Sequence, residues 1–219
     1  MSLTVHHLEY SRSTRILWLL EELGLDYELR TYARDRKTYR APPELADVHP
    51  LGRAPLVTDG DLVLAESGAI LEHFVEKTGR LGPETAEERA RYRFFLHYAE
   101  GSVMPPLLVR LLMSKTKSAP VPFFVKPIVR SIATKVEAAY SDGEIERHFS
   151  FLDAELADRT WLVGERLTAA DIQMLYPLAA GLSRGAGHRP NIEAWLERVA
   201  ARPAYQRALE KGGPLVPGG

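Results

Sequence analysis

The chain has 219 residues, of which 45% are hydrophobic, a formal net charge of −1 and no cysteine. This length and composition predict one or two domains with an ample hydrophobic core, and the balanced charge gives no support for binding to nucleic acid or to an anionic membrane. The lack of cysteine excludes disulfides, thiolate metal sites and a cysteine nucleophile, so any thiol chemistry needs a thiol that the ligand brings.

The N-terminal residues and the histidines narrow the class of protein further. No apolar run is long enough to span a bilayer, and residues 1–12 lack the charged and apolar regions of a secretory signal. We therefore expect a soluble cytoplasmic protein with no nucleic-acid and no membrane partner. The seven histidines are scattered, and His6 and His7 would point to opposite faces of a strand, so no metal site is predicted.

A βαβ unit is predicted at the start of the chain. Residues 3–8 form a β-rich run, and the polar break at residues 9–13 precedes an apolar pattern with helical spacing that ends at Gly24. Residues 27–32 return to a strand pattern. Parallel pairing of the two strands requires a crossover helix of about this length.

Two short strands and two helices are predicted to follow. Pro42 indicates the first turn of a short helix. A strand entered through Pro55 is joined by an Asp59–Gly60 turn to a second strand over residues 62–64, and a helix covers residues 67–77. The complete order, βαβ then αββα, matches a thioredoxin-like domain.

The second part of the chain is predicted to be entirely helical. Residues 78–84 have linker composition, with two glycines and a proline between helical patterns. The periodicity beyond them predicts helices at residues 86–115, 123–157, 169–182, 191–201 and 203–211. The second of these is expected to break near Pro127 or near residues 141–143. The expected domains are residues 1–80 and residues 86–219.

A helix start is clearly marked in this second part. Thr168 and Asp171 form a capping-box pattern, and Leu167 and Ile172 are spaced to pack on each other as a hydrophobic staple. Such a cap contributes about 1 kcal/mol to stability. Its predicted role is in folding and not in chemistry.

A small-ligand site is predicted around Pro55. An isolated X-Pro bond is most often trans, but a cis bond after Ala54 would turn the N–H and C=O of that residue outward, free to pair with an extended peptide. The neighbouring residues favour this possibility. Glu66 offers a carboxylate for an amine, and Ser67 at a helix start offers a hydroxyl and free N–H groups for a carboxylate. Together they fit the two ends of a free amino acid group.

Four motifs resemble those of a known family. Residues 49–56 (HPLGRAPL), followed by Glu66 and Ser67, resemble the glutathione-binding half of a cytosolic-type glutathione transferase. Residues 10–24 and 40–45 resemble in particular a bacterial and fungal branch, and residues 167–172 are similar to the capping segment of the family's helical domain. The resemblance implies an α+β protein, with a thioredoxin-like βαβαββα domain followed by an all-α helical bundle.

The resemblance also implies a detoxifying enzyme that uses glutathione as co-substrate and presents it as thiolate. Ser11 occupies the place of the serine that serine-type classes use as a donor to the sulfur. Ser13, or backbone N–H groups of residues 12–14, could do the same, and Tyr10 is a third option. The alternative is that Ser11 or Ser13 only caps the helix.

Six residues are implied to bind glutathione: Arg40, Arg53, Ala54, Pro55, Glu66 and Ser67. Glu66 and Ser67 would hold the γ-glutamyl amine and carboxylate, and Ala54 would pair with the cysteinyl backbone. Arg53 or Arg40 could meet the glycyl carboxylate, although a solvated surface role for Arg40 is at least as plausible.

The helical domain would supply the second substrate's pocket. The candidate residues are Tyr98, Met104, Pro105, Pro106, Leu108, Phe123 and Phe124. Clusters of this kind are also typical of plain core. The resemblance further implies a homodimer, in which Glu100 could reach the partner subunit's glutathione.

Three functions remain open at this point. The first is a transferase that adds glutathione thiolate to an apolar electrophile. The second is a glutathione-dependent peroxidase or disulfide reductase, for which two glutathiones would supply both sulfurs. The third is a non-catalytic glutathione-binding protein on the same fold, because fold does not determine function.

Overall fold

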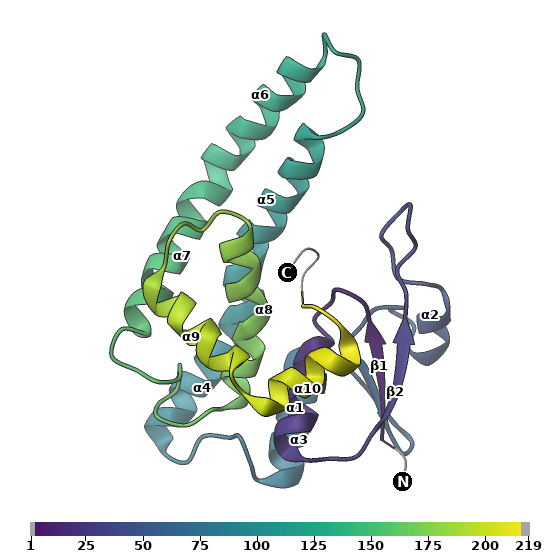
Figure 1. Cartoon of the computed structure of the whole chain (residues 1–219), viewed down its shortest axis with the longest axis vertical. Coiled ribbons are helices and arrows are strands. Elements are labelled where there is room, and N and C mark those ends of the chain that lie inside the picture. Colours follow the sequence, from purple (N-terminus) through teal and green to yellow (C-terminus); the bar gives the residue numbers. More distant parts are fainter. Residues whose placement is uncertain (1–2, 216–219) are drawn as a thin grey trace.

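The computed structural model describes residues 3–215, and Figure 1 shows a small sheet beside a larger set of helices. The N-terminal elements are β1 (Leu3–Leu8), α1 (Thr14–Leu23), β2 (Glu28–Tyr32), α2 (Glu44–Val48), β3 (Leu56–Asp59), β4 (Leu62–Ala65) and α3 (Ser67–Thr78). This βαβαββα order confirms the predicted thioredoxin-like fold.

The four strands form one mixed sheet in the order β2-β1-β3-β4. β1 pairs parallel to β2, as the crossover through α1 requires, and antiparallel to β3, which pairs antiparallel to β4. In β1, His6 contacts the hydroxyl of Tyr32, whereas His7 contacts Ser13 and the end of the chain's last helix. The two histidines therefore lie on opposite faces of the sheet, as predicted.

The helical part contains seven α-helices in the described residues. They are α4 (Ala86–Tyr98), α5 (Met104–Lys117), α6 (Lys126–Val136), α7 (Asp142–Glu155), α8 (Ala169–Ser183), α9 (Pro190–Ala200) and α10 (Pro203–Gly212). Turns of π-helix join α4 to α5 at Ala99–Val103 and α6 to α7 at Glu137–Ser141. The chain thus stays helical where a break was expected near residues 141–143, and Pro127 lies in the first turn of α6, where proline is tolerated.

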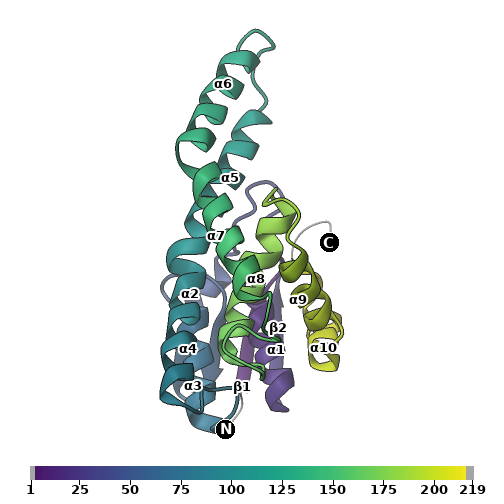
Figure 2. The same ribbon diagram turned by 90° about the vertical axis from the view of Figure 1, so that its left-hand side faces the viewer.

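The α5 and α6 helices form an antiparallel hairpin that extends well beyond the remaining helices, as Figures 1 and 2 show. The loop at its tip joins Lys117 to Lys126. This projection matters for the site, because it carries the tip away from the sheet and from α1.

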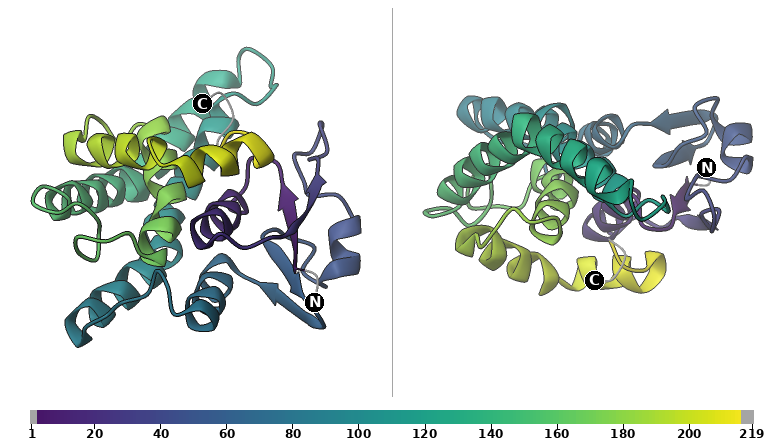
Figure 3. Two further views of the ribbon diagram at one scale, coloured as in Figure 1. Left: turned by 60° about the horizontal axis from the view of Figure 1, so that its bottom comes forward. Right: turned by 90° about the horizontal axis from the view of Figure 1, so that it is seen from above.

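α1 is the most enclosed helix of the N-terminal part. The predicted pattern was that of a helix with one apolar face, yet every residue from Thr14 to Leu20 is buried. The sheet covers one side of α1, and α8 and α10 cover others; Figure 3 shows α10 beside α1, where Trp18 meets Tyr205 edge-on at 5.3 Å. A helix packed on several sides loses its exposed face.

One hydrophobic core runs through both halves of the chain. The cluster that contains Val5 and Leu17 also contains Met174 and Trp195. The connection between the halves lies between the end of α3 and the start of α4. The expected division into domains at residues 1–80 and 86–219 stays a prediction.

The predicted capping box is present at the start of α8. The Asp171 carboxylate accepts hydrogen bonds from the backbone N–H groups of Leu162 and Thr168 at 2.8 and 2.9 Å. Leu167 and Ile172, the staple pair, are both buried. Burial raises the pKa of Asp171 to about 6 even though these hydrogen bonds oppose the rise.

Candidate active site

A cavity lies at the bond between Ala54 and Pro55, which is cis. The cis form is the one that the neighbouring residues favoured. The cavity has a volume of about 250 Å³. Its walls are formed by Arg12, His49, Leu51, Arg53, Ala54, Pro55, Ala65, Glu66, Ser67 and Glu100. Five of the six residues predicted to bind glutathione therefore meet at one cavity.

The N-terminus of α3 forms one end of this cavity. Ser67 is the first residue of the helix and is buried, whereas Glu66 is exposed and has a positive φ of 70°. A non-glycine residue in this region of backbone space is uncommon and is often found at functional sites. The free N–H groups of the first turn suit an anion, and the Glu66 carboxylate suits a neighbouring cation. The pair can hold both charges of an amino acid group.

A second cavity of about 520 Å³ continues from the first. It shares Arg12, Leu51, Arg53 and Ala54 with the first cavity and adds Leu8, Arg34, Arg40, Ala41 and Gly52. Arg40 and Arg53 are exposed, and Arg34 is held by the carbonyl of Glu9 at 2.9 Å. Four arginines make this end of the groove suitable for a carboxylate. Arg12 and Arg34 were not predicted, because nothing local in the sequence places them beside Arg40.

Ser11 and Ser13 lie together at the start of α1. Ser13 is completely buried, and its Oγ lies 2.8 Å from Nδ1 of His7 and 2.7 Å from Oγ of Ser11. Ser11 keeps an exposed fraction of 6%, and Arg12, between the two serines, lines both cavities. Tyr10 is half-buried with a φ of 50°. Neither serine forms part of the wall of the 250 Å³ cavity.

A charged cluster, which sequence analysis missed, lies beside the cavity. Arg15 has no exposed surface, and its Nη1 donates to Glu100 at 2.7 Å, to Ser67 at 3.1 Å and to Gln173 at 3.2 Å. Arg12 donates to the same Glu100 oxygen at 2.9 Å. The cluster therefore links α1, α3 and α8 to the π-helical turn after α4, and it supports the serine at the start of α3.

Electrostatics hold this cluster in its charged form. Burial lowers the pKa of Arg15 to about 10, which still leaves the guanidinium charged at neutral pH, and Glu100 opposes the fall. Burial acts to raise the pKa of Glu100, but Arg15 and Arg12 outweigh it and hold that pKa below its usual value. The expected role of Glu100 toward a partner subunit stays a prediction, because here it binds arginines of its own chain.

The residues predicted to form the second substrate's pocket do not all lie together. Tyr98 contacts His148 at 2.6 Å, and Met104 is buried in the core. Phe123 and Phe124 are 83% and 66% exposed in the loop between α5 and α6, at the far end of the hairpin in Figure 1. Their assignment to this pocket is wrong, because the two helices carry the loop away from α1.

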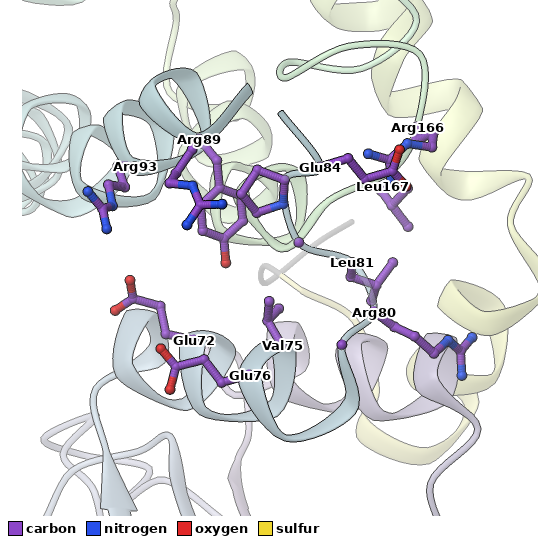
Figure 4. A pocket seen from close by; sticks show the side chains of 14 residues that line it. Glu72, Val75, Glu76, Arg80, Leu81, Glu84, Arg89, Arg93, Arg166 and Leu167 are labelled. Atoms are coloured by element: carbon purple, nitrogen blue, oxygen red, sulfur yellow. Dashed lines mark ion pairs between the residues drawn. The ribbon is translucent and has the colours of Figure 1, made fainter. Parts of the chain in front are cut away.

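A larger cavity, of about 560 Å³, lies between α3 and α4. Figure 4 shows its charged walls, with Glu72 and Glu76 on α3 facing Arg89 and Arg93 on α4. None of the residues predicted to bind glutathione lines it. Size alone therefore does not identify the candidate site.

Within residues 3–215, no three His, Asp or Glu side chains are grouped so that they could hold a metal ion. In the same part of the chain, no helix is both long enough and apolar enough to cross a membrane.

A thioredoxin-like sheet with a cis-proline cavity, joined to a helical bundle that closes one side of that cavity, is the arrangement of the glutathione S-transferase fold. The glutathione S-transferase N-terminal domain matches residues 1–76, and the C-terminal domain matches residues 112–203. The chain belongs to the glutathione S-transferase family, as its motifs indicated, and it is a transferase.

Relatives match over nearly the whole chain. Glutathione S-transferase 1 of Saccharomyces cerevisiae is 38% identical and covers 96% of this chain and 95% of its own. Glutathione S-transferase 3 of Schizosaccharomyces pombe is 36% identical, covering 95% and 87%. The crystal structure of a glutathione S-transferase from Actinobacillus pleuropneumoniae has a TM-score of 0.76 at 36% identity and covers 97% and 94%.

Proposed function

We propose that the protein binds glutathione in the cavity at Ala54–Pro55 and presents it as thiolate to an apolar electrophile. The observation that carries this proposal is the meeting, in one cavity, of the α3 N-terminus, the exposed Glu66 carboxylate and Ala54 at the cis bond. Support also comes from the relatives named glutathione S-transferase and from a glutathione transferase family member of Pseudomonas fluorescens solved with glutathione, at 25% identity.

The two connected cavities suit an extended tripeptide. The γ-glutamyl amine would lie at Glu66, and its carboxylate at Ser67 and the first N–H groups of α3. The cysteinyl backbone would pair with Ala54. The glycyl carboxylate would reach the basic end of the groove at Arg53 and Arg40. This order places the thiol between the two ends, on the side of α1.

The enzyme's task is then to ionise the thiol. A free thiol with a pKa of about 8.5 is only a few per cent ionised at neutral pH, and a fall of about two units corresponds to about 2.7 kcal/mol. A charge-assisted hydrogen bond of about 1.5 to 3 kcal/mol from Ser11, together with the α1 N-terminus, supplies this amount. Ser11 is favoured over Ser13, because every hydrogen bond of the buried Ser13 is already made within the protein.

The experiment is to follow the ultraviolet absorbance of bound glutathione thiolate across pH in the wild type, Ser11→Ala and Tyr10→Phe. We expect a bound thiol pKa about two units below the free value in the wild type. Ser11→Ala should raise that pKa by at least one unit and lower kcat/KM with an aryl halide about tenfold or more. Tyr10→Phe, the matched control, should change neither. A raised thiol pKa in Tyr10→Phe and an unchanged one in Ser11→Ala would instead assign the hydrogen bond to the sulfur to Tyr10.

Disulfide reduction is a second candidate, favoured by one observation. The Pseudomonas fluorescens structure holds two glutathiones, and a glutathione transferase from Burkholderia graminis, also 25% identical, holds two per subunit. In this reaction one glutathione thiolate attacks the disulfide and releases one thiol, and the second glutathione attacks the mixed disulfide, which releases the second thiol and forms oxidised glutathione. Production of oxidised glutathione from a small dialkyl disulfide, at a rate above that of Ser11→Ala, would support it. A peroxidase would oxidise glutathione in the same way with a hydroperoxide as substrate.

We also infer a homodimer located in the cytoplasm, on the grounds of the family alone. Light scattering of the purified protein should give twice the mass of one chain. A bound thiol with an unchanged pKa would contradict the proposed activation of glutathione as thiolate.

A further inference from the structure

His7 is a buried titratable group that the proposed mechanism does not yet use. It lies in β1 with no exposed surface, and its ring joins two distant parts of the chain. Nε2 lies 2.7 Å from the backbone carbonyl of Gly212 in α10, and Nδ1 lies 2.8 Å from Oγ of Ser13. A carbonyl can only accept, so Nε2 carries the hydrogen. In the neutral ring, Nδ1 is therefore an acceptor and faces the Ser13 hydroxyl.

This tautomer sets the direction of the two serine hydroxyls. Ser13 donates to Nδ1, which is closer than its alternative acceptor, the Leu8 carbonyl at 3.2 Å. The Ser13 oxygen then accepts from Ser11 at 2.7 Å and from the Leu8 N–H at 3.1 Å. The Ser11 oxygen accepts from the Ser13 N–H at 3.2 Å and keeps one lone pair free. In this resting state Ser11 can accept a proton at its oxygen but does not offer its own.

The approach of α10 to His7 is close and depends on Gly212. A Cβ at this position would lie 2.4 Å from Cδ1 of Leu17 and 3.2 Å from Nε2 of His7. Glycine therefore lets the last turn of α10 bring its carbonyl to the ring. The tautomer of a residue near the start of the chain is set by a group 205 residues further on.

We propose that His7 receives the proton of the glutathione thiol through Ser11 and Ser13. This inference rests on the proposed function, since it needs the thiol beside Ser11. The S–H bond breaks and its proton passes to Oγ of Ser11, the Ser11 proton passes to Oγ of Ser13, and the Ser13 proton passes to Nδ1. The products are a thiolate, two neutral hydroxyls with reversed direction and an imidazolium ion.

The reversed direction is the one that thiolate stabilisation requires. Ser11 now donates to the sulfur anion, Ser13 donates to Ser11, and the imidazolium donates to both Ser13 and the Gly212 carbonyl. No proton is lost or gained along the relay. His7 does not touch the sulfur and acts through the two serines, so it is a positioning residue.

The surroundings of His7 keep it neutral until a thiol is bound. Burial lowers its pKa, while the Gly212 carbonyl and the carboxylate of Glu9 act in the opposite direction. β2 presents Thr31 opposite His7, and α1 presents Ser13. α10 presents the Gly212 carbonyl, and Lys211 beside it is paired with Glu21. A thiolate formed at Ser11 adds the negative charge that stabilises the imidazolium.

The decisive experiment uses the unaltered protein. Nitrogen NMR of the full chain labelled at histidine, with His7→Gln to assign the signal, reports the protonation of both ring nitrogens. We expect the neutral Nε2–H tautomer in the free protein and with bound S-methylglutathione, whose thioether has no proton to give. At neutral pH, where His7 is neutral in the free protein, bound glutathione should give thiolate absorbance together with the imidazolium form of His7.

This experiment distinguishes a failure of the proton relay from a failure of the proposed function. If thiolate forms at a lowered pKa while His7 stays neutral, the relay is overturned and the proposed function stands. If bound glutathione shows no lowered thiol pKa, the proposed function fails and the relay falls with it.

Two variants add a kinetic test. His7→Asn keeps an acceptor for Ser13 but cannot take a proton, and Ser13→Ala interrupts the relay. Both should return the bound thiol pKa toward about 8.5. The acidic limb of kcat/KM for the electrophile, measured at saturating glutathione, should move by the same amount, while KM for glutathione changes less than twofold. A structural role would instead raise KM and leave the pH profile in place, which would overturn the relay. If neither variant folds, the NMR measurement decides.

Discussion

Two polar clusters are buried at the start of α1, and they differ in charge. On the sheet side, His7, Ser13 and Ser11 form a neutral chain. On the side of the helical bundle, Arg15 and Glu100 form a charged pair. Every polar atom of the neutral chain has a partner, whereas Nε and Nη2 of Arg15 have none among the described residues.

The difference indicates a division of labour. A chain of neutral hydroxyls ending in an imidazole can pass a proton to the ring and reverse its donors, and the thiolate at the other end balances the imidazolium that forms, so it suits the movement of a proton. The charged cluster keeps its charge at neutral pH, because the pKa of Arg15 is still about 10. It binds groups from four elements, so it suits the positioning of Ser67 and of the cavity wall.

The largest expected effect comes from breaking the charged cluster. Arg15→Met should lower the free energy of unfolding by about 3 kcal/mol, because it removes a fully buried cation, leaves Ser67 and Gln173 without its hydrogen bonds and leaves Glu100 with Arg12 alone. Urea denaturation measures this loss. The matched control is Arg12→Met, which removes a cation from the same Glu100 oxygen but is 38% exposed. It should cost less than about 1 kcal/mol. Equal losses would show that burial of Arg15 has no energetic role.

Breaking the neutral chain should lower the free energy of unfolding less than breaking the charged cluster does. Ser13→Ala leaves the Leu8 N–H and Nδ1 of His7 without their partner, and it should lower the free energy of unfolding by about 2 kcal/mol. Ser11→Ala removes a hydroxyl at the outer end of the chain, where 6% of the residue is exposed, and should lower the free energy of unfolding by about 0.5 kcal/mol. Urea denaturation of both variants gives the comparison. A larger loss for Ser11→Ala would contradict the assignment of Ser13 as the structural member.

The smallest expected effect is on the pH dependence of stability. The pKa of His7 is lowered in the folded protein, so the unfolded chain binds more protons near pH 6.5. His7 therefore contributes stability above its unfolded pKa, and this contribution is lost as the pH falls through 6.5 and below. His7→Gln should flatten the slope of unfolding free energy between about pH 7 and 5. His188→Gln, at a side chain that is 77% exposed, should leave it unchanged. A steeper slope in His7→Gln would contradict the lowered pKa of His7 in the folded protein.

The sequence alone determined the order of the strands and helices. Each depends on local signals, such as the apolar spacing that ends at Gly24 and the capping box at Thr168. The residues of the cavity between Ala54 and Ser67 were found for the same reason, whereas Arg53 was implied by the family resemblance. Adjacent residues at a turn and a helix start keep nearly the same relation in any packing of the domain.

Only the tertiary structure determined the contacts between residues that lie far apart in the sequence. Arg15 stands directly before an apolar run, but its partner Gln173 lies 158 residues away, and His7 meets a carbonyl 205 residues away. Phe123 and Phe124 were assigned to the pocket of the second substrate, but the α5–α6 hairpin places them far from α1. Such contacts depend on how whole helices pack. The apolar pattern of a helix predicts which of its faces is buried, but it does not predict which polar group of a distant element will lie against that face.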